Sequence, residues 1–160
     1  MPFTKQSRLD TLPPRPTTKQ IAIAWLGSTL AIGSITDLGQ IANLPLILGS
    51  LGASCVLVFG YPNAQFSQPR NLIAGHLLCS IIGLSFLKFI GSEWWCMALA
   101  VGTALAIMMA TRTVHPPAGS NPVIIFLTQP DWQFLWFPTL SGVIILFCLS
   151  RLFLKITKQI

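Results

Sequence analysis

Long apolar runs dominate this chain and limit what it can fold into. They lie at about residues 20–36, 44–60, 72–91, 95–111, 122–128 and 138–154. A straight bilayer crossing needs ~20 apolar residues, with a range of roughly 17–25, and every run except 122–128 meets or approaches that length. Charged residues make up 9% of the chain, against about 25% in soluble domains. The sequence therefore predicts an all-α fold, a polytopic transmembrane helix bundle.

The apolar runs also predict the domain boundaries. We expect a transmembrane helical domain at 20–155, a flexible basic tail at 1–19 and a short tail at 156–160. The first twenty residues are polar, basic and proline-rich, and they lack the apolar stretch of a secretory signal. We therefore expect the N-terminal tail to stay in the cytoplasm.

Basic residues predict an even number of crossings, because Lys and Arg concentrate on the cytoplasmic side of membrane proteins. With six crossings, both tails and the loops that hold Arg70 and Arg112 fall inside. Three acidic loops then fall outside, those with Asp37, Glu93 and Asp131. Five crossings would export a basic tail. Because 122–128 is short, four crossings with a re-entrant fifth segment is an open alternative.

Small residues predict where helices approach one another. They recur every four positions, a spacing that allows close helix contact in lipid. The rows are Ala98, Gly102, Ala106 and Ala110; Gly49 and Ala53; and Gly75, Cys79 and Gly83. These faces serve either packing within the chain or a homo-oligomer.

Two stretches that begin at Gly52 and Gly102 share an order of features. Each has an apolar helix, a polar loop with proline, a nearby arginine, and a Ser-amide-Pro triplet, at 67–69 and 120–122. An internal two-helix repeat explains this, and so does convergence on helix-start chemistry. Ser and amide side chains cap free N–H groups, and Pro suits the first helical position. We expect two helix N-termini, which favour anions, beside the arginines.

The densest polar segment inside the apolar body is TRTVHPPAGSNP, residues 111–122. Its two successive prolines interrupt a helix, and irregular backbone at membrane depth must be surrounded by protein or line a water-filled cavity. One interpretation is a loop where Arg112 and His115 meet a small ligand, and the other is an ordinary cytoplasmic turn. His76 in the third run is ionisable, so it is either functional or a neutral, hydrogen-bonded histidine.

The segments GASCVLVFG (52–60), SQPRNLIAGH (67–76) and HPPAGSNP (115–122) resemble the HPP family of small integral membrane proteins. The family is named for the His-Pro-Pro found here at 115–117, and the resemblance covers about 20–155. Members lack an established catalytic activity, and four membrane helices are usually counted. Some plant and cyanobacterial members are regarded as nitrite transporters. The resemblance implies a transporter of a small monovalent inorganic anion, nitrite in particular, in a cyanobacterial-type plasma membrane.

Nitrite offers two oxygens, and a guanidinium group donates two parallel hydrogen bonds to such a pair. We expect Arg70 and Arg112 and the two proline-started helix ends to converge on one hydrated pocket, with either histidine able to carry a proton. The predicted substrate-binding residues are Arg70, Asn71, His76, Arg112, His115, Ser120 and Asn121.

Other functions are weakly supported. No nucleophile–base, paired-carboxylate or metal-ligand arrangement can be assembled, so we expect no enzyme activity, no cofactor and no metal. The net charge of +6 lies mainly in the tails, which argues against nucleic acid. The expected partners are nitrite, the lipid bilayer and a second copy in a homo-oligomer. The alternatives are a non-transporting scaffold or assembly subunit, and a transporter or channel for another small solute.

Overall fold

The computed structural model describes residues 15–158, and every regular element in that range is helical. The predicted all-α bundle is confirmed; most of the predicted basic tail lies outside the described residues. The six α-helices are α1 (Thr18–Ala42), α2 (Gly49–Gly60), α3 (Pro69–Phe89), α4 (Trp94–Ala110), α5 (Asn121–Thr128) and α6 (Ser141–Ile156). Shorter turns of helix are η1 (Gln65–Ser67), η2 (Pro116–Ser120), η3 (Trp132–Leu135) and η4 (Trp136–Leu140).

Three helical stretches are long and apolar enough to cross a membrane, namely Thr18–Ala42, Pro69–Phe89 and Trp132–Ile156. At about 1.5 Å per residue, the 21 residues of α3 match a hydrocarbon core of roughly 30 Å. The first helix starts at a capping box, in which the Thr17 and Gln20 side chains each accept a hydrogen bond from the other's backbone N–H. By length, the candidates for crossing are therefore α1, α3 and the stretch made of η3, η4 and α6, and α4 is a shorter apolar helix of 17 residues.

Helix α2 is shorter than the apolar run predicts. The run 44–60 suggests a full crossing, but only the 12 residues of Gly49–Gly60 are helical. Pro45 has no N–H and disfavours helical backbone in the residue before it. Residues 44–48 are therefore non-helical, and Leu46 and Leu48 fill the core from this segment. The short fifth segment is confirmed, because α5 has 8 residues.

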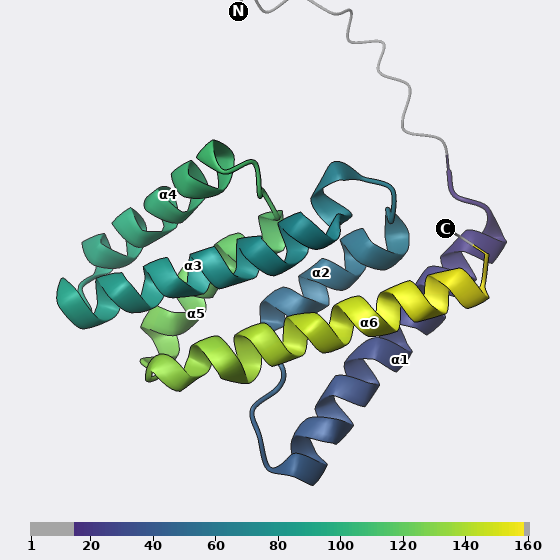
Figure 1. Cartoon of the computed structure of the whole chain (residues 1–160), viewed down its shortest axis with the longest axis horizontal. Helices are drawn as coiled ribbons and strands as arrows, with labels where there is room; N and C mark the ends of the chain where they lie inside the picture. Colours follow the sequence, from purple (N-terminus) through teal and green to yellow (C-terminus); the bar gives the residue numbers. More distant parts are fainter. Residues whose placement is uncertain (1–14, 159–160) are drawn as a thin grey trace, which may run out of the picture.

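Successive helices reverse direction, so the bundle has two distinct ends (Figure 1). At one end the Phe59 and Phe153 rings, from the ends of α2 and α6, meet edge to face with centroids 6.0 Å apart. This basic end also holds the start of α1 and the turns with Arg70 and Arg112. At the acidic end Lys88 Nζ lies 2.8 Å from Asp131 Oδ1.

Helix α3 lies centrally and packs against α4, α5, η2 and α6. The predicted small-residue row on α3 is confirmed as a packing face. A Cβ added at Gly75 would stand 2.8 Å from His115 Cβ, and one at Gly83 would stand 2.9 Å from Pro122 Cα. These glycines let the segment 113–122 lie directly on α3.

The predicted small-residue row on α4 faces outward instead. All its members are exposed: Ala98, Gly102, Ala106 and Ala110. The buried row is offset by two positions and comprises Cys96, Ala100, Ala104 and Met108. Both rows have the same four-residue spacing, so spacing alone did not separate them; the Met108 contact with Cys79, 3.5 Å between sulfurs, fixes the inner face. A homo-oligomer stays a prediction.

Candidate functional site

The segment between α4 and α5 folds into the bundle from the basic end. Arg70 Nη2 donates to the Thr111 carbonyl over 2.6 Å, and Asn71 Nδ2 donates to the Val114 carbonyl over 2.7 Å. His115 is 0% exposed. The first turn of α3 thus holds this segment in place, with Thr113, His115 and Ala118 buried and the turn at Arg112 exposed.

Two short helices start inside the bundle and run to opposite ends. Helix α2 follows the extended segment 44–48 and ends at the basic end, whereas α5 follows η2 and ends towards the acidic end (Figure 1). The first turn of each contains a buried polar atom without a hydrogen-bond partner in the described range, Ser50 Oγ and Asn121 Oδ1; Ser141 Oγ, at the start of α6, is a third such atom. The positive ends of both helix dipoles therefore point towards the interior.

Six polar side chains, each 0% exposed, form a continuous hydrogen-bonded chain in the bundle interior. We call them the buried polar cluster: Ser54, His76, Ser80, His115, Asn121 and Thr139. They come from α2, α3, α5 and the turns beside them. Buried polar groups are stable only when hydrogen-bonded, so their shared burial needs this connected arrangement.

A single hydroxyl joins the two histidines. Ser54 Oγ lies 3.0 Å from His76 Nε2 and 2.8 Å from His115 Nε2. It also lies 2.8 Å from the Ser50 carbonyl. The two imidazole rings have centroids 5.1 Å apart and are tilted by 49°.

Further contacts extend the chain in both directions. His115 Nδ1 is 2.7 Å from the Phe66 carbonyl. On the other side Asn121 Nδ2 is 3.2 Å from His76 Nδ1, 3.3 Å from the His76 carbonyl and 2.9 Å from Ser80 Oγ. Ser80 Oγ in turn lies 3.0 Å from Thr139 Oγ1.

These contacts fix the tautomers of the neutral rings. A carbonyl oxygen only accepts, so His115 carries its proton on Nδ1 and donates it to Phe66. The His76 carbonyl likewise fixes the amide of Asn121 with Nδ2 towards His76, so His76 Nδ1 accepts and its proton is on Nε2. His76 Nε2–H then donates to Ser54, whose hydroxyl donates to His115 Nε2. The two rings have opposite tautomers.

The predicted substrate-binding residues divide into two groups. His76, His115 and Asn121 meet in the buried polar cluster, and Asn71 positions the segment beside it. The others lie at the surface: Arg70, Arg112 and Ser120 are exposed. Their role in binding stays a prediction.

The arginines do not meet over a shared described pocket. Arg70 reaches the Thr111 carbonyl, so it lies beside the turn that holds Arg112, whose backbone is left-handed with φ 57°. Neither arginine lines either of the two pockets described below. Both arginines are exposed at the basic end beside the His115 segment, and we call this pair the basic mouth.

The predicted capping chemistry is also different. Pro69 and Pro122 occupy first-turn positions as expected, but neither helix has a side-chain cap. Ser67 Oγ donates instead to the carbonyls of Leu57 and Tyr61, and Ser120 Oγ donates to that of Pro117. The prolines of η2 supply no N–H, and η2 continues directly into α5. The start of α5 therefore contributes dipole orientation and the Asn121 side chain, with few free N–H donors.

Sequence reasoning missed Ser54, Ser80 and Thr139. Ser54 and Ser80 are small polar residues within apolar runs, so composition does not set them apart. A usable signal existed, because His76 and Ser80 are four residues apart, as are Ser50 and Ser54. Residues at that spacing share one helical face.

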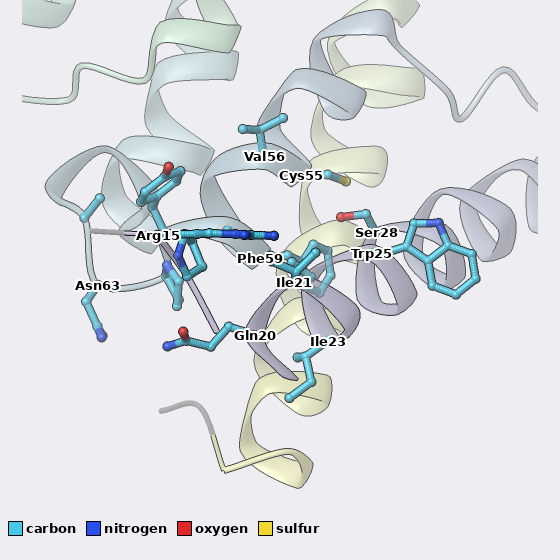
Figure 2. A pocket seen from close by; sticks show the side chains of 16 residues that line it. Arg15, Gln20, Ile21, Ile23, Trp25, Ser28, Cys55, Val56, Phe59 and Asn63 are labelled. Carbon is cyan, nitrogen blue, oxygen red and sulfur yellow. The ribbon is translucent and has the colours of Figure 1, made fainter. Parts of the chain in front are cut away.

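Two pockets lie elsewhere. The larger, about 940 Å³, lies at the basic end between α1 and α2. Figure 2 shows Asn63 and Gln20 on one side of it and Trp25 on the other. The second, about 530 Å³, lies at the acidic end and is lined by residues such as Pro45, Phe134 and Pro138. Neither includes a predicted substrate-binding residue.

Comparisons with known proteins place this architecture in a family. The sequence model of a family described as HPP, transmembrane region, matches residues 13–160. A transmembrane protein of Dictyostelium discoideum is 32% identical over 149 residues, covering 86% of this chain and 52% of that protein. A second is 30% identical over 152 residues, covering 88% and 49%. The chain spans about half the length of these curated relatives, and no solved structure matches it.

Proposed function

The chain belongs to the HPP transmembrane family, and from this premise we propose that it transports a small monovalent inorganic anion, nitrite in particular. The choice of nitrite rests on the sequence resemblance to members regarded as nitrite transporters. It rests also on the two oxygens of nitrite, which suit a guanidinium donor. The interior of the bundle supports transport.

One observation carries the proposal: two short helices begin in the interior and run to opposite ends, each with an unpaired buried polar atom in its first turn. Interrupted helices that start near mid-membrane form the substrate sites of many transporters. Unpaired buried polar atoms cost free energy, so Ser50 Oγ and Asn121 Oδ1 indicate a place for water or a solute.

The charge distribution favours an anion over a cation. The carboxylates in the described range, Asp37, Glu93 and Asp131, are all exposed. The interior therefore has inward-pointing positive dipole ends and no buried negative charge among residues 15–158. A cation at the centre would meet no compensating charge, whereas an anion would be stabilised by both dipoles.

The basic mouth provides the approach to this centre. Arg70 and Arg112 are exposed beside the segment that descends to His115. Positive charges at an opening raise the local concentration of anions. By the positive-inside rule, the basic end faces the cytoplasm.

The test is uptake by purified protein in liposomes, against a panel of nitrite, nitrate, formate and chloride. We expect saturable nitrite uptake, and slower uptake in Arg70→Gln and Arg112→Gln with unchanged thermal unfolding. Arg151→Gln is the matched control, because Arg151 is an exposed arginine on α6 near the basic end. Protein-free liposomes correct for leakage of nitrous acid through lipid. The absence of protein-dependent flux of any anion would reject the proposal. Equal fluxes in all three variants would show that Arg70 and Arg112 take no part in transport.

A further inference from the structure

The hydroxyl of Ser54 can serve the two histidines in more than one protonation state. A serine hydroxyl accepts two hydrogen bonds and donates one. In the neutral state Ser54 accepts from His76 Nε2–H and donates to His115 Nε2. The Ser50 carbonyl, 2.8 Å away, is a second acceptor within reach of the same hydroxyl hydrogen.

Adding one proton to His115 leaves every hydrogen with a partner. The new Nε2–H of His115 donates to Ser54 Oγ, and the Ser54 hydrogen rotates to the Ser50 carbonyl. His115 Nδ1–H keeps its bond to the Phe66 carbonyl. Ser54 then accepts from both rings and donates once, which fills its hydrogen-bonding capacity.

A proton added to His76 instead would find no hydrogen-bond acceptor. A second N–H on His76 would form at Nδ1, where the Asn121 Nδ2 donor lies 3.2 Å away. Two donors would face each other unless the Asn121 amide turned over. The cluster is therefore asymmetric, and His115 is the ring that accommodates the charge.

We propose that the His76–Ser54–His115 triad binds one proton with each transported anion, so that transport is electroneutral proton–anion symport. The inference rests on the proposed function and specifies its coupling. The proton forms an N–H bond at His115 Nε2 as the anion enters, and that bond breaks when anion and proton leave together. No oxidation or reduction is involved.

The physical reason for coupling is the cost of a bare charge in the bilayer. An unpaired ion in a low-dielectric interior is strongly disfavoured, whereas a hydrogen-bonded ion pair is tolerated. A protonated His115 supplies the positive charge that the interior otherwise lacks. Anion and proton therefore occupy the centre together more readily than either does alone.

Other titratable or charged groups lie on the elements around the rings without bonding to them in the described range. On the elements packed around them these are Cys55 on α2; Arg70, Cys79 and Lys88 on α3; Cys96 on α4; Cys148, Arg151 and Lys155 on α6; and Arg112 in the turn. Within residues 15–158, no hydrogen bond or ion pair links them to either imidazole. The two rings are the titrating groups at this centre.

The coupling test uses wild-type protein in liposomes that enclose a pH-sensitive dye, with the membrane potential clamped. We expect nitrite entry to acidify the lumen with one proton per anion, beyond the rate in protein-free liposomes. Ser54→Ala removes the acceptor of His115 Nε2–H, and loss of a hydrogen bond to a charged group predicts a flux ~10-fold to 100-fold lower. Ser85→Ala, on α3 outside the cluster, is the matched control. Nitrite entry without acidification would overturn symport while leaving anion transport intact.

A second measurement tests the proton site independently of transport. The sequence has 2 histidines, so ¹⁵N-histidine labelling of protein without a histidine tag gives two rings, assigned with His76→Gln. At pH 8 we expect opposite tautomers, with the proton on Nε2 of His76 and on Nδ1 of His115. On acidification His115 should become imidazolium first. Identical tautomers, or first protonation of His76, would overturn the proposal even if no anion were transported.

Discussion

Gly75→Ala tests whether the buried polar cluster depends on close contact between α3 and the His-Pro-Pro segment. The added methyl would stand 2.8 Å from His115 Cβ and 3.1 Å from the Thr113 carbonyl oxygen. Carbon atoms pack best at about 3.5–4.0 Å. Because the contacts are with a Cβ and a backbone atom, no flexible side-chain end can move aside, and the whole segment must retreat by about 1 Å.

Two consequences follow from that retreat. Overpacking of a tight interior typically destabilises by about 1–3 kcal/mol. The distance from His115 Nε2 to Ser54 Oγ is 2.8 Å in the structure, and a shift of about 1 Å would break this bond because hydrogen bonds fail beyond ~3.5 Å. Gly75→Ala should therefore lower both stability and proton-coupled uptake.

Buried cysteines provide the stability assay. Cys55, Cys79 and Cys96 are buried, so a thiol-reactive dye reports unfolding during heating in detergent. We expect a lower melting temperature for Gly75→Ala, by roughly 2–4 °C per kcal/mol if soluble-protein scaling holds. Gly102→Ala is the control, since a Cβ there meets nothing within 4 Å, and helix propensity favours Ala by up to about 1 kcal/mol.

The reasoning would be refuted if the two glycine variants melted alike and transported alike. Equal melting with lost transport would instead mean that the segment moves without loss of stability. Loss in Gly102→Ala alone would point to an α4 interface with another subunit.

Three further variants test separate parts of the account. Asn121→Asp should slow uptake at least tenfold, because a carboxylate beside His76 Nδ1 would accept a hydrogen bond from a protonated Nδ1 and would hold the proton on His76. Uptake as fast as wild type would argue against the asymmetry of the triad. Leu72→Ala, at a fully buried position, should destabilise by about 2–5 kcal/mol, whereas Leu152→Ala at an exposed position should lower the thiol-dye melting temperature far less, and similar losses would contradict the assigned core. The hydrogen bond from Lys88, and then the Lys88 charge, hold the pKa of Asp131 below its usual value. The ion pair therefore stabilises the fold at pH values above the pKa of Asp131 in the unfolded chain. This stabilisation is lost as the pH falls through the lower pKa of Asp131 in the folded protein. Lys88→Met should raise the pKa of Asp131 to its ordinary range by carboxyl ¹³C NMR, and an unchanged titration would contradict the pairing.

The sequence predicted the membrane architecture well because lipid imposes simple rules. Apolar run length predicted where most helices lie, and the basic turns share one end with both ends of the described chain, as the charge pattern predicts (Figure 1). The even number of crossings stays a prediction. Pro116 and Pro117 correctly predicted irregular backbone between α4 and α5. These features depend on local composition, which a single sequence contains.

The site was harder to predict because it depends on contacts across the bundle. Ser54 is 22 residues from His76 and 61 from His115, and no local pattern connects them. The charge of Arg70 and Arg112 suggested an anion site, yet both arginines lie at the surface. The inner face of α4 was also ambiguous, since two rows of small residues share one spacing. The extended start before α2 was missed because residues 44–48 are as apolar as a helix.

The central claim is that the anion passes the buried polar cluster. Its most direct test is titration of ¹⁵N-histidine-labelled protein with nitrite at constant pH. We predict saturable shifts of both ring signals, from His76 and His115, at the nitrite concentration that half-saturates uptake, with much weaker shifts for an anion that is not transported. Undisturbed ring signals in protein that transports nitrite would contradict the claim and place the path elsewhere.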